Sequence, residues 1–177
     1  MKQQGKLFSN TKVLSILNFI GVSFILLKII TYIQWSILLL SNNQLPEYYF
    51  LLKIAIKDMP IYVSITTYVV YIICYILVLI GLNAIRDSIK FLSKGELFNE
   101  KISFLLEKAS KLFLIFIIGI FTTNLFLALF KSNSISSFIN LFSGEIVIFS
   151  ILPFMLLFIS NIIKQGTIIK KDNDLTI

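Results

Sequence analysis

The chain has 177 residues, of which 57% are hydrophobic and 14% are charged, with a formal net charge of +7. A soluble domain carries roughly 25% charged residues, so a water-soluble globule is excluded and the excess apolar surface must face lipid. One cysteine and no histidine are present, which excludes an intrachain disulfide and removes the commonest general base and metal ligand. The length allows one domain, residues 1–177.

The first apolar run follows a short polar N-terminus and extends from Val13 to Leu40. It is longer than the ~7–15-residue apolar region of a cleavable signal peptide, so we predict a retained membrane-spanning helix over about residues 13–36. Asn10 or Thr11 can cap the start of this helix. The next segment, 41–60, is predicted to be external, with a short helix on the membrane surface in its second half.

The second predicted span covers about residues 61–82 and carries a line of hydroxyl groups. Ser64, Tyr68, Tyr71 and Tyr75 recur at helical spacing, which places them on one face. Polar atoms within a bilayer prefer the interior of a helix bundle, so we predict that this face points inward. One interpretation of this pattern is that the tyrosines pack in the bundle and their hydroxyl groups form hydrogen bonds locally. The alternative is that they line a ligand site.

The stretch RDSIKFLSKGELFNEKISFLLEKASK, from Arg86 to Lys111, is the one long interior segment that is dense in charge. Gly95 is suited to end a helix in the left-handed conformation, and Asn99 is suited to cap the next one. We therefore predict a helical hairpin over residues 83–111 that extends the second and third spans.

Two further apolar runs complete the chain, with predicted spans over about residues 112–130 and 141–163. A short polar external turn, 131–140, separates them, and a polar tail follows over residues 164–177. The predicted fold class is all-α: an integral-membrane four-helix bundle whose second and third helices extend into a cytoplasmic helical hairpin.

The basic residues fix the predicted orientation. The two termini and the hairpin hold 12 of the 16 Lys and Arg residues, and the external segments hold three. Cytoplasmic loops carry an excess of basic residues, so both termini are predicted to be cytoplasmic in a multi-pass protein of the inner (cell) membrane. Because the basic residues adjoin the apolar runs, we expect contact with the lipid bilayer and no direct binding of nucleic acid.

Lys28 and Glu145 are the two charges predicted to lie at membrane depth. Counted from the cytoplasmic boundaries, they lie about 22 Å and about 27 Å deep. A charge in the bilayer needs a partner or a wet cavity. One interpretation is an ion pair that joins the first span to the last, and the other is that each side chain snorkels separately to the outer interface.

The sequence shows no paired carboxylates within one span and no Gly-rich phosphate loop, so we expect a non-enzymatic protein without cofactors. The basic hairpin and tail can attract anionic lipid, or they can present a docking surface to a cytoplasmic protein. The first function hypothesis is a membrane-anchored regulatory or interaction protein. The alternative is a small transporter, channel or immunity-type protein that acts within the bilayer.

The end of the chain resembles a known family. Asp172-Asn173-Asp174-Leu175-Thr176-Ile177 is similar to the terminus of a family of small four-span bacterial membrane proteins, a domain of unknown function that includes YoaS-like proteins. Gly95 and Phe98 resemble that family's G-x-x-F turn between its second and third spans. The resemblance implies a partner, a helix-turn-helix transcription regulator, with the turn and the terminus as docking contacts. It implies no catalytic residue.

Overall fold

The computed structural model describes residues 2–41, 60–131 and 144–175. In this part of the chain all regular secondary structure is helical, so the all-α prediction is confirmed. The helices are α1 (Lys2–Leu40), α2 (Ile61–Ser93), α3 (Glu100–Lys131) and α5 (Gly144–Leu175). The surface helix predicted within 41–60 and the turn predicted at 131–140 fall outside the described residues.

Each of the four helices is long and apolar enough to cross a membrane. The shorter ones have 32 residues, or about 48 Å, which exceeds the ~30 Å of hydrocarbon in a bilayer. Large apolar side chains such as Phe19, Ile118 and Phe158 are exposed on the outer surfaces. Surfaces of this kind are stable only against lipid or protein, which supports a multi-pass membrane protein.

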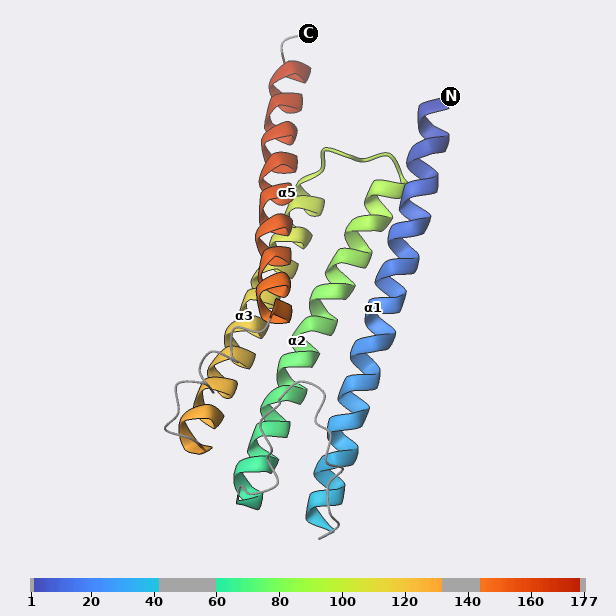
Figure 1. Cartoon of the computed structure of the whole chain (residues 1–177). Coiled ribbons are helices and arrows are strands. Elements are labelled where there is room, and N and C mark those ends of the chain that lie inside the picture. The colour runs from blue at the N-terminus through green and yellow to red at the C-terminus, as the bar shows by residue number, and fades with distance from the viewer. Residues whose placement is uncertain (1, 42–59, 132–143, 176–177) are drawn as a thin grey trace.

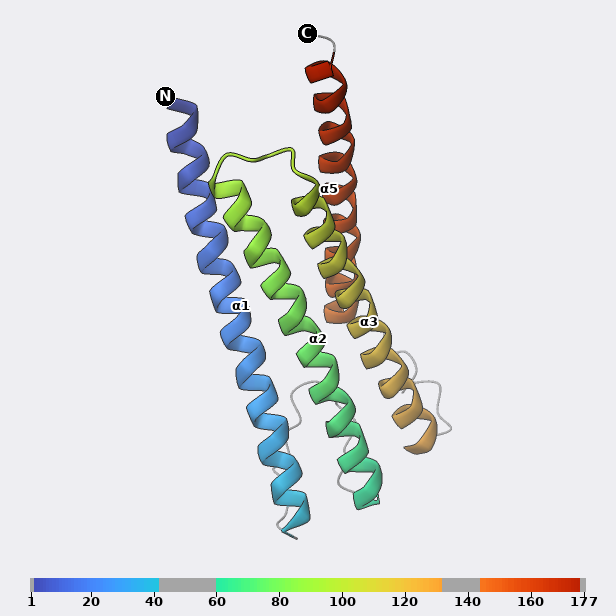
Figure 2. The same ribbon diagram turned by 180° about the vertical axis from the view of Figure 1, so that it is seen from behind.

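The helices pack in the order of the chain. Among the described residues, the extensive contacts join α1 to α2, α2 to α3, and α3 to α5. Figures 1 and 2 show α1 on one side of α2, and α3 with α5 lying across it on the other side. The start of α1, the connection between α2 and α3, and the end of α5 all lie at the same end of the molecule (Figure 1).

The first helix is longer than predicted. It begins at Lys2, so the prediction of a helix start at an Asn10 or Thr11 cap is wrong. Residues 2–10 are rich in Lys and Gln, which favour helix, and extending an existing helix requires no new nucleation. Thr11 and Asn18, seven residues apart, are both buried, so the packed face of α1 continues beyond the apolar run.

The turn between α2 and α3 has the local structure that the sequence predicts. Gly95 has φ +83°, the left-handed conformation predicted there. The side-chain oxygen of Asn99 accepts the backbone N–H of Lys101 at 2.9 Å, as predicted for an N-cap. The two helices run antiparallel on either side of this turn (Figure 1).

The last helix is displaced along the row. The Ser110 hydroxyl donates to the carbonyl of Pro153 at 2.8 Å, and that of Ser160 donates to the carbonyl of Ser103 at 2.8 Å. These pairs align residues 153–160 of α5 with residues 103–110 of α3. In both views α5 begins beside the middle of α3, so α5 is shifted toward the end of the molecule that carries the turn.

Candidate functional site

The turn between α2 and α3 contacts the last part of α5. The ring of Phe98 lies directly against Gly166, where any side chain would collide with it. The ammonium of Lys171 contacts the carboxylate of Glu100 at 2.7 Å, and this bond holds the pKa of Glu100 below its usual range. We call the region formed by residues 94–99 of the turn and residues 166–173 of α5 the turn–tail surface.

The turn–tail surface contains most of the predicted docking residues. Gly95 and Phe98 line a depression there, together with Lys170 of α5. Asp172 and Asn173 are exposed on the last turns of the helix. The side chains of Asp174 and Leu175, and all of residues 176–177, fall outside the described part of the chain, so their predicted role stays a prediction.

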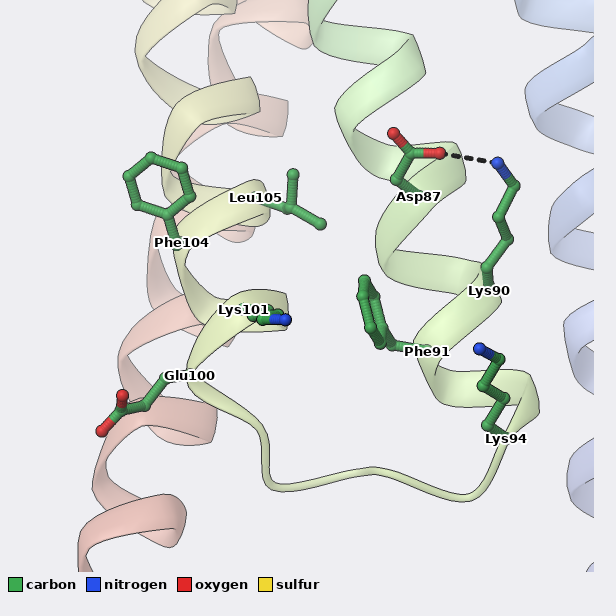
Figure 3. A pocket seen from close by; sticks show the side chains of 8 residues that line it. All are labelled: Asp87, Lys90, Phe91, Lys94, Glu100, Lys101, Phe104 and Leu105. Carbon is green, nitrogen blue, oxygen red and sulfur yellow. Dashed lines mark hydrogen bonds and ion pairs between the residues drawn. The ribbon is translucent and has the colours of Figure 1, made fainter.

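A second hollow, the α2–α3 groove, lies between the ends of these two helices near the turn. Figure 3 shows Phe91 of α2 facing Leu105 and Lys101 of α3 across it. Its volume is about 640 Å³, and it is a widely open groove. Its lining consists of Asp87, Lys90, Phe91, Lys94, Glu100, Lys101, Phe104 and Leu105.

The predicted polar face of α2 lies inside the helix row. Its four residues are all buried, with exposed fractions of 2% for Ser64, 0% for Tyr68, 3% for Tyr71 and 5% for Tyr75. Tyr32 of α1 packs on the three tyrosines, with ring centroids 5.4–5.8 Å apart. The Tyr71 hydroxyl donates to the side-chain oxygen of Asn124 on α3 at 2.5 Å. This cluster joins α1, α2 and α3 at one level.

Replacing Asn124 by leucine is expected to destabilise the protein by about 1 kcal/mol, because the Tyr71 hydroxyl loses its acceptor in an apolar core. The double variant Tyr71→Phe/Asn124→Leu should recover much of that loss, since neither polar group then remains. Cys74 is the only cysteine and is buried, so its reaction with a fluorogenic maleimide during heating reports unfolding. If the destabilisation of the double variant equalled the sum of those of Tyr71→Phe and Asn124→Leu, this role for the bond would be contradicted.

Lys28 and Glu145 remain a hypothetical pair. Lys28 is half-buried on α1, and its ammonium lies 5.4 Å from the centre of the Phe24 ring. Glu145 belongs to the first turn of α5, but its side chain falls outside the described residues. The ion pair and the separate-snorkelling alternative both stay predictions.

Several polar contacts between helices were not predicted. The Asn18 amide donates to the carbonyl of Leu82 at 2.9 Å and ties α1 to α2. Ser103 and Ser160 each donate to the other's backbone carbonyl, and Ser110 bonds the carbonyl of Pro153. We call these contacts between α3 and α5 the serine seam. The sequence signal that could have revealed it is a seven-residue spacing, which separates Ser103 from Ser110 and Pro153 from Ser160.

Among the described residues, no three His, Cys, Asp or Glu side chains gather as metal ligands. A family model matches residues 26–177, and it is described as "Protein of unknown function (DUF2975)". Neither the curated proteins nor the solved structures provide a match to this chain.

Proposed function

Because this chain belongs to the DUF2975 family, whose function is unknown, we propose from its own geometry that it is a membrane-anchored interaction protein without enzymatic activity. Its partner is a cytoplasmic protein, for which a helix-turn-helix transcription regulator is the first candidate. The proposed location is the inner membrane, with both termini and the turn in the cytoplasm. The support for this orientation is the basic excess at that end of the molecule.

The observation that carries this proposal is an apolar pair on a helix that projects beyond the turn. Gly166 lies against the turn through Phe98, so the helix from Thr167 to Leu175, about 13 Å long, extends past it (Figure 1). Ile168 and Ile169 in this segment are 52% and 60% exposed. Three charged residues follow the pair directly, Lys170, Lys171 and Asp172, which favours a watery setting and a protein partner.

The two segments of the turn–tail surface contact each other, which suits recognition. The packing of Phe98 on Gly166 and the bond between Lys171 and Glu100 hold the projecting helix against the turn. A preformed surface loses less conformational entropy when a partner binds. We expect the partner to bury Ile168 and Ile169 in an apolar groove with charges of both signs at its rim, facing Lys170 and Asp172.

The packed interior supports an anchoring role more than transport. A transporter or channel needs polar groups around a wet path near the bilayer midplane. Here the tyrosines that could line such a path contact one another ring to ring, and the Tyr71 hydroxyl is bonded to Asn124. The transporter alternative would require this cluster to open.

The test is site-specific photo-crosslinking in native membranes. A photoreactive residue at Ile169 should form an adduct with a cytoplasmic protein, and deletion of residues 172–177 should weaken that adduct. The matched control is the same residue at Ile151, which is 54% exposed on the same helix but is proposed to face lipid. Absence of a protein adduct at Ile169, or identical adducts at both positions, would sink the proposal.

A further inference from the structure

The serine seam repeats itself along both helices at the spacing of one heptad. In α5, Ser160 follows Pro153 by seven residues, and Thr167, seven residues further on, is also buried. In α3, Ser103 and Ser110 have the same spacing. If α5 moved by one heptad away from the turn, about 10 Å, Ser160 would face Ser110. Thr167 would then face Ser103, so hydroxyl groups would meet hydroxyl groups again.

The other contacts between these helices repeat at the same spacing. Leu156 and Ile163, seven residues apart, are the α5 residues of the buried apolar cluster shared with α3, and the same movement would put Ile163 in the place of Leu156. The ammonium of Lys171 contacts Glu100, and Glu107 lies one heptad further along α3, where it would meet Lys171 after the movement. The seam therefore offers a second register built from the same kinds of contact.

The described register leaves apolar side chains of α5 beside exposed charges. The hydrogen bonds of the serine seam place Met155 and Phe158 level with residues 105–108 of α3. These two side chains are 56% and 66% exposed. The ion pair between Lys111 and Glu107 lies at this level or nearer the membrane, and its side chains are 67% and 37% exposed. Charges this exposed belong in water, so Met155 and Phe158 do not lie in hydrocarbon.

The second register would move these apolar side chains into the membrane. A displacement of seven residues away from the turn puts Met155 level with Ile115 and Phe158 level with Leu112. Both levels lie within the apolar run of α3 that begins at residue 112, and Ile115 is itself exposed on the outer surface. Removal of apolar surface from water is favourable, so lipid stabilises the second register.

The described register is stabilised by the contact at the turn. Gly166 lets the ring of Phe98 lie directly against α5, where any side chain would collide with the ring. In the second register Asn173 takes the place of Gly166, so the ring has to turn away. Lipid therefore favours one register and the contact between Phe98 and Gly166 favours the other. This is the differential stabilisation that a two-state element requires.

We propose that α5 moves between two registers on α3, one heptad apart, and that this movement controls access to the turn–tail surface. In the described register the helix with Ile168 and Ile169 projects beyond the turn (Figure 1). In the second register both residues lie about 10 Å nearer the membrane and no longer project. Only the contacts with α3 have to rearrange, because the extensive described contacts of α5 are with α3 alone. The control of access rests on the proposed function, whereas the movement itself does not.

The experiment is disulfide trapping of the full chain in native membranes, in a Cys74→Ser background and with an added oxidant. The pair S103C/S160C reports the described register, in which the two serine hydroxyls are 3.0 Å apart. The pair S103C/T167C reports the second register. The control pair S110C/T167C is brought together by neither register. We expect a disulfide in S103C/S160C, and severalfold more disulfide in S103C/T167C than in the control pair.

Gly166→Ala should shift the balance toward the second register. A side chain at residue 166 makes Phe98 turn away in the described register also, so that register loses its advantage. The disulfide of S103C/T167C should rise severalfold, and that of S103C/S160C should fall. Gly21→Ala on α1 is the matched control, because its new Cβ would meet Leu82 at an ordinary 3.7 Å, and it should change neither yield.

Two results would overturn the movement. The first is a yield of S103C/T167C no higher than that of S110C/T167C, with residue 166 as glycine and as alanine alike. The second is a failure of S103C/S160C to form, because the seam would then differ from the one described. None of these measurements involves a partner protein. An absent adduct at Ile169 would therefore remove the proposed function and leave the movement standing.

Discussion

Replacing Gly81 by leucine is expected to destabilise the protein by about 1–3 kcal/mol, the usual effect of overpacking a filled core. Gly81 is buried where α2 meets α3. A Cβ atom there would lie 2.6 Å from Cε1 of Phe113 on α3. Phe113 is only 5% exposed and belongs to the apolar cluster that joins α2, α3 and α5, so its ring has no free space to move into. The two helices must separate instead.

The heating assay with a fluorogenic maleimide on Cys74 measures this effect, since the thiol becomes reactive when α2 leaves α3. The midpoint temperature of unfolding should fall for Gly81→Leu. The matched control is Gly21→Ala on α1, where a new Cβ would meet Leu82 at an ordinary contact distance of 3.7 Å. We expect the midpoint of the control to stay or to rise, because alanine favours helix over glycine. An unchanged midpoint for Gly81→Leu would show that the α2–α3 contact is looser than described.

The helices and the turn could be predicted because their signals are local. A run of about 20 apolar residues predicts a span without knowledge of its neighbours. A glycine followed by an Asx residue predicts a helix end and a new helix start, as Gly95 and Asn99 show. The error at the start of α1 has the same origin, because Asn10 offers a local cap signal that the continuing helix overrides.

The register of α5 could not be predicted because it depends on contacts between distant residues. Hydropathy gives the length of a span but not its depth relative to the other helices. The depth is set by the Ser103–Ser160 and Ser110–Pro153 contacts, whose members are 57 and 43 positions apart in sequence. Serine within an apolar run is also an ambiguous signal, because its hydroxyl can bond its own helix equally well.

The candidate sites were predictable to different degrees. Gly95 and Phe98 stand out in the sequence because they interrupt a charged hairpin, and both lie on the turn–tail surface. The contact between Phe98 and Gly166 joins residues that no local pattern relates. The α2–α3 groove was equally hidden, since Lys94 and Lys101 meet at Phe91 only after the chain has turned.

The seam between α3 and α5 should be the most sensitive part of the row. Ser160 is 1% exposed and Ser103 is 4% exposed, and each hydroxyl donates to the other's backbone carbonyl. Replacing Ser160 by leucine is expected to cost about 1–3 kcal/mol, because the branched side chain does not fit between such closely spaced backbones. Ser160→Ala should cost less, about 1 kcal/mol, since it removes only the hydrogen bonds.

The position of α5 can be followed at the far end of the seam. In a Cys74→Ser background, cysteines at Glu100 and Lys171, whose charged groups are 2.7 Å apart, should be joined efficiently by a short bismaleimide. Ser160→Leu should reduce this cross-linking severalfold. Ser15→Leu on an exposed position of α1 is the matched control and should leave it unchanged.

Undiminished cross-linking in Ser160→Leu would mean that the turn, through Phe98 and Gly166, holds α5 without the serine seam. Loss of cross-linking would instead mean that the serine seam positions the turn–tail surface. This is the expected result, because the extensive described contacts of α5 are with α3 alone.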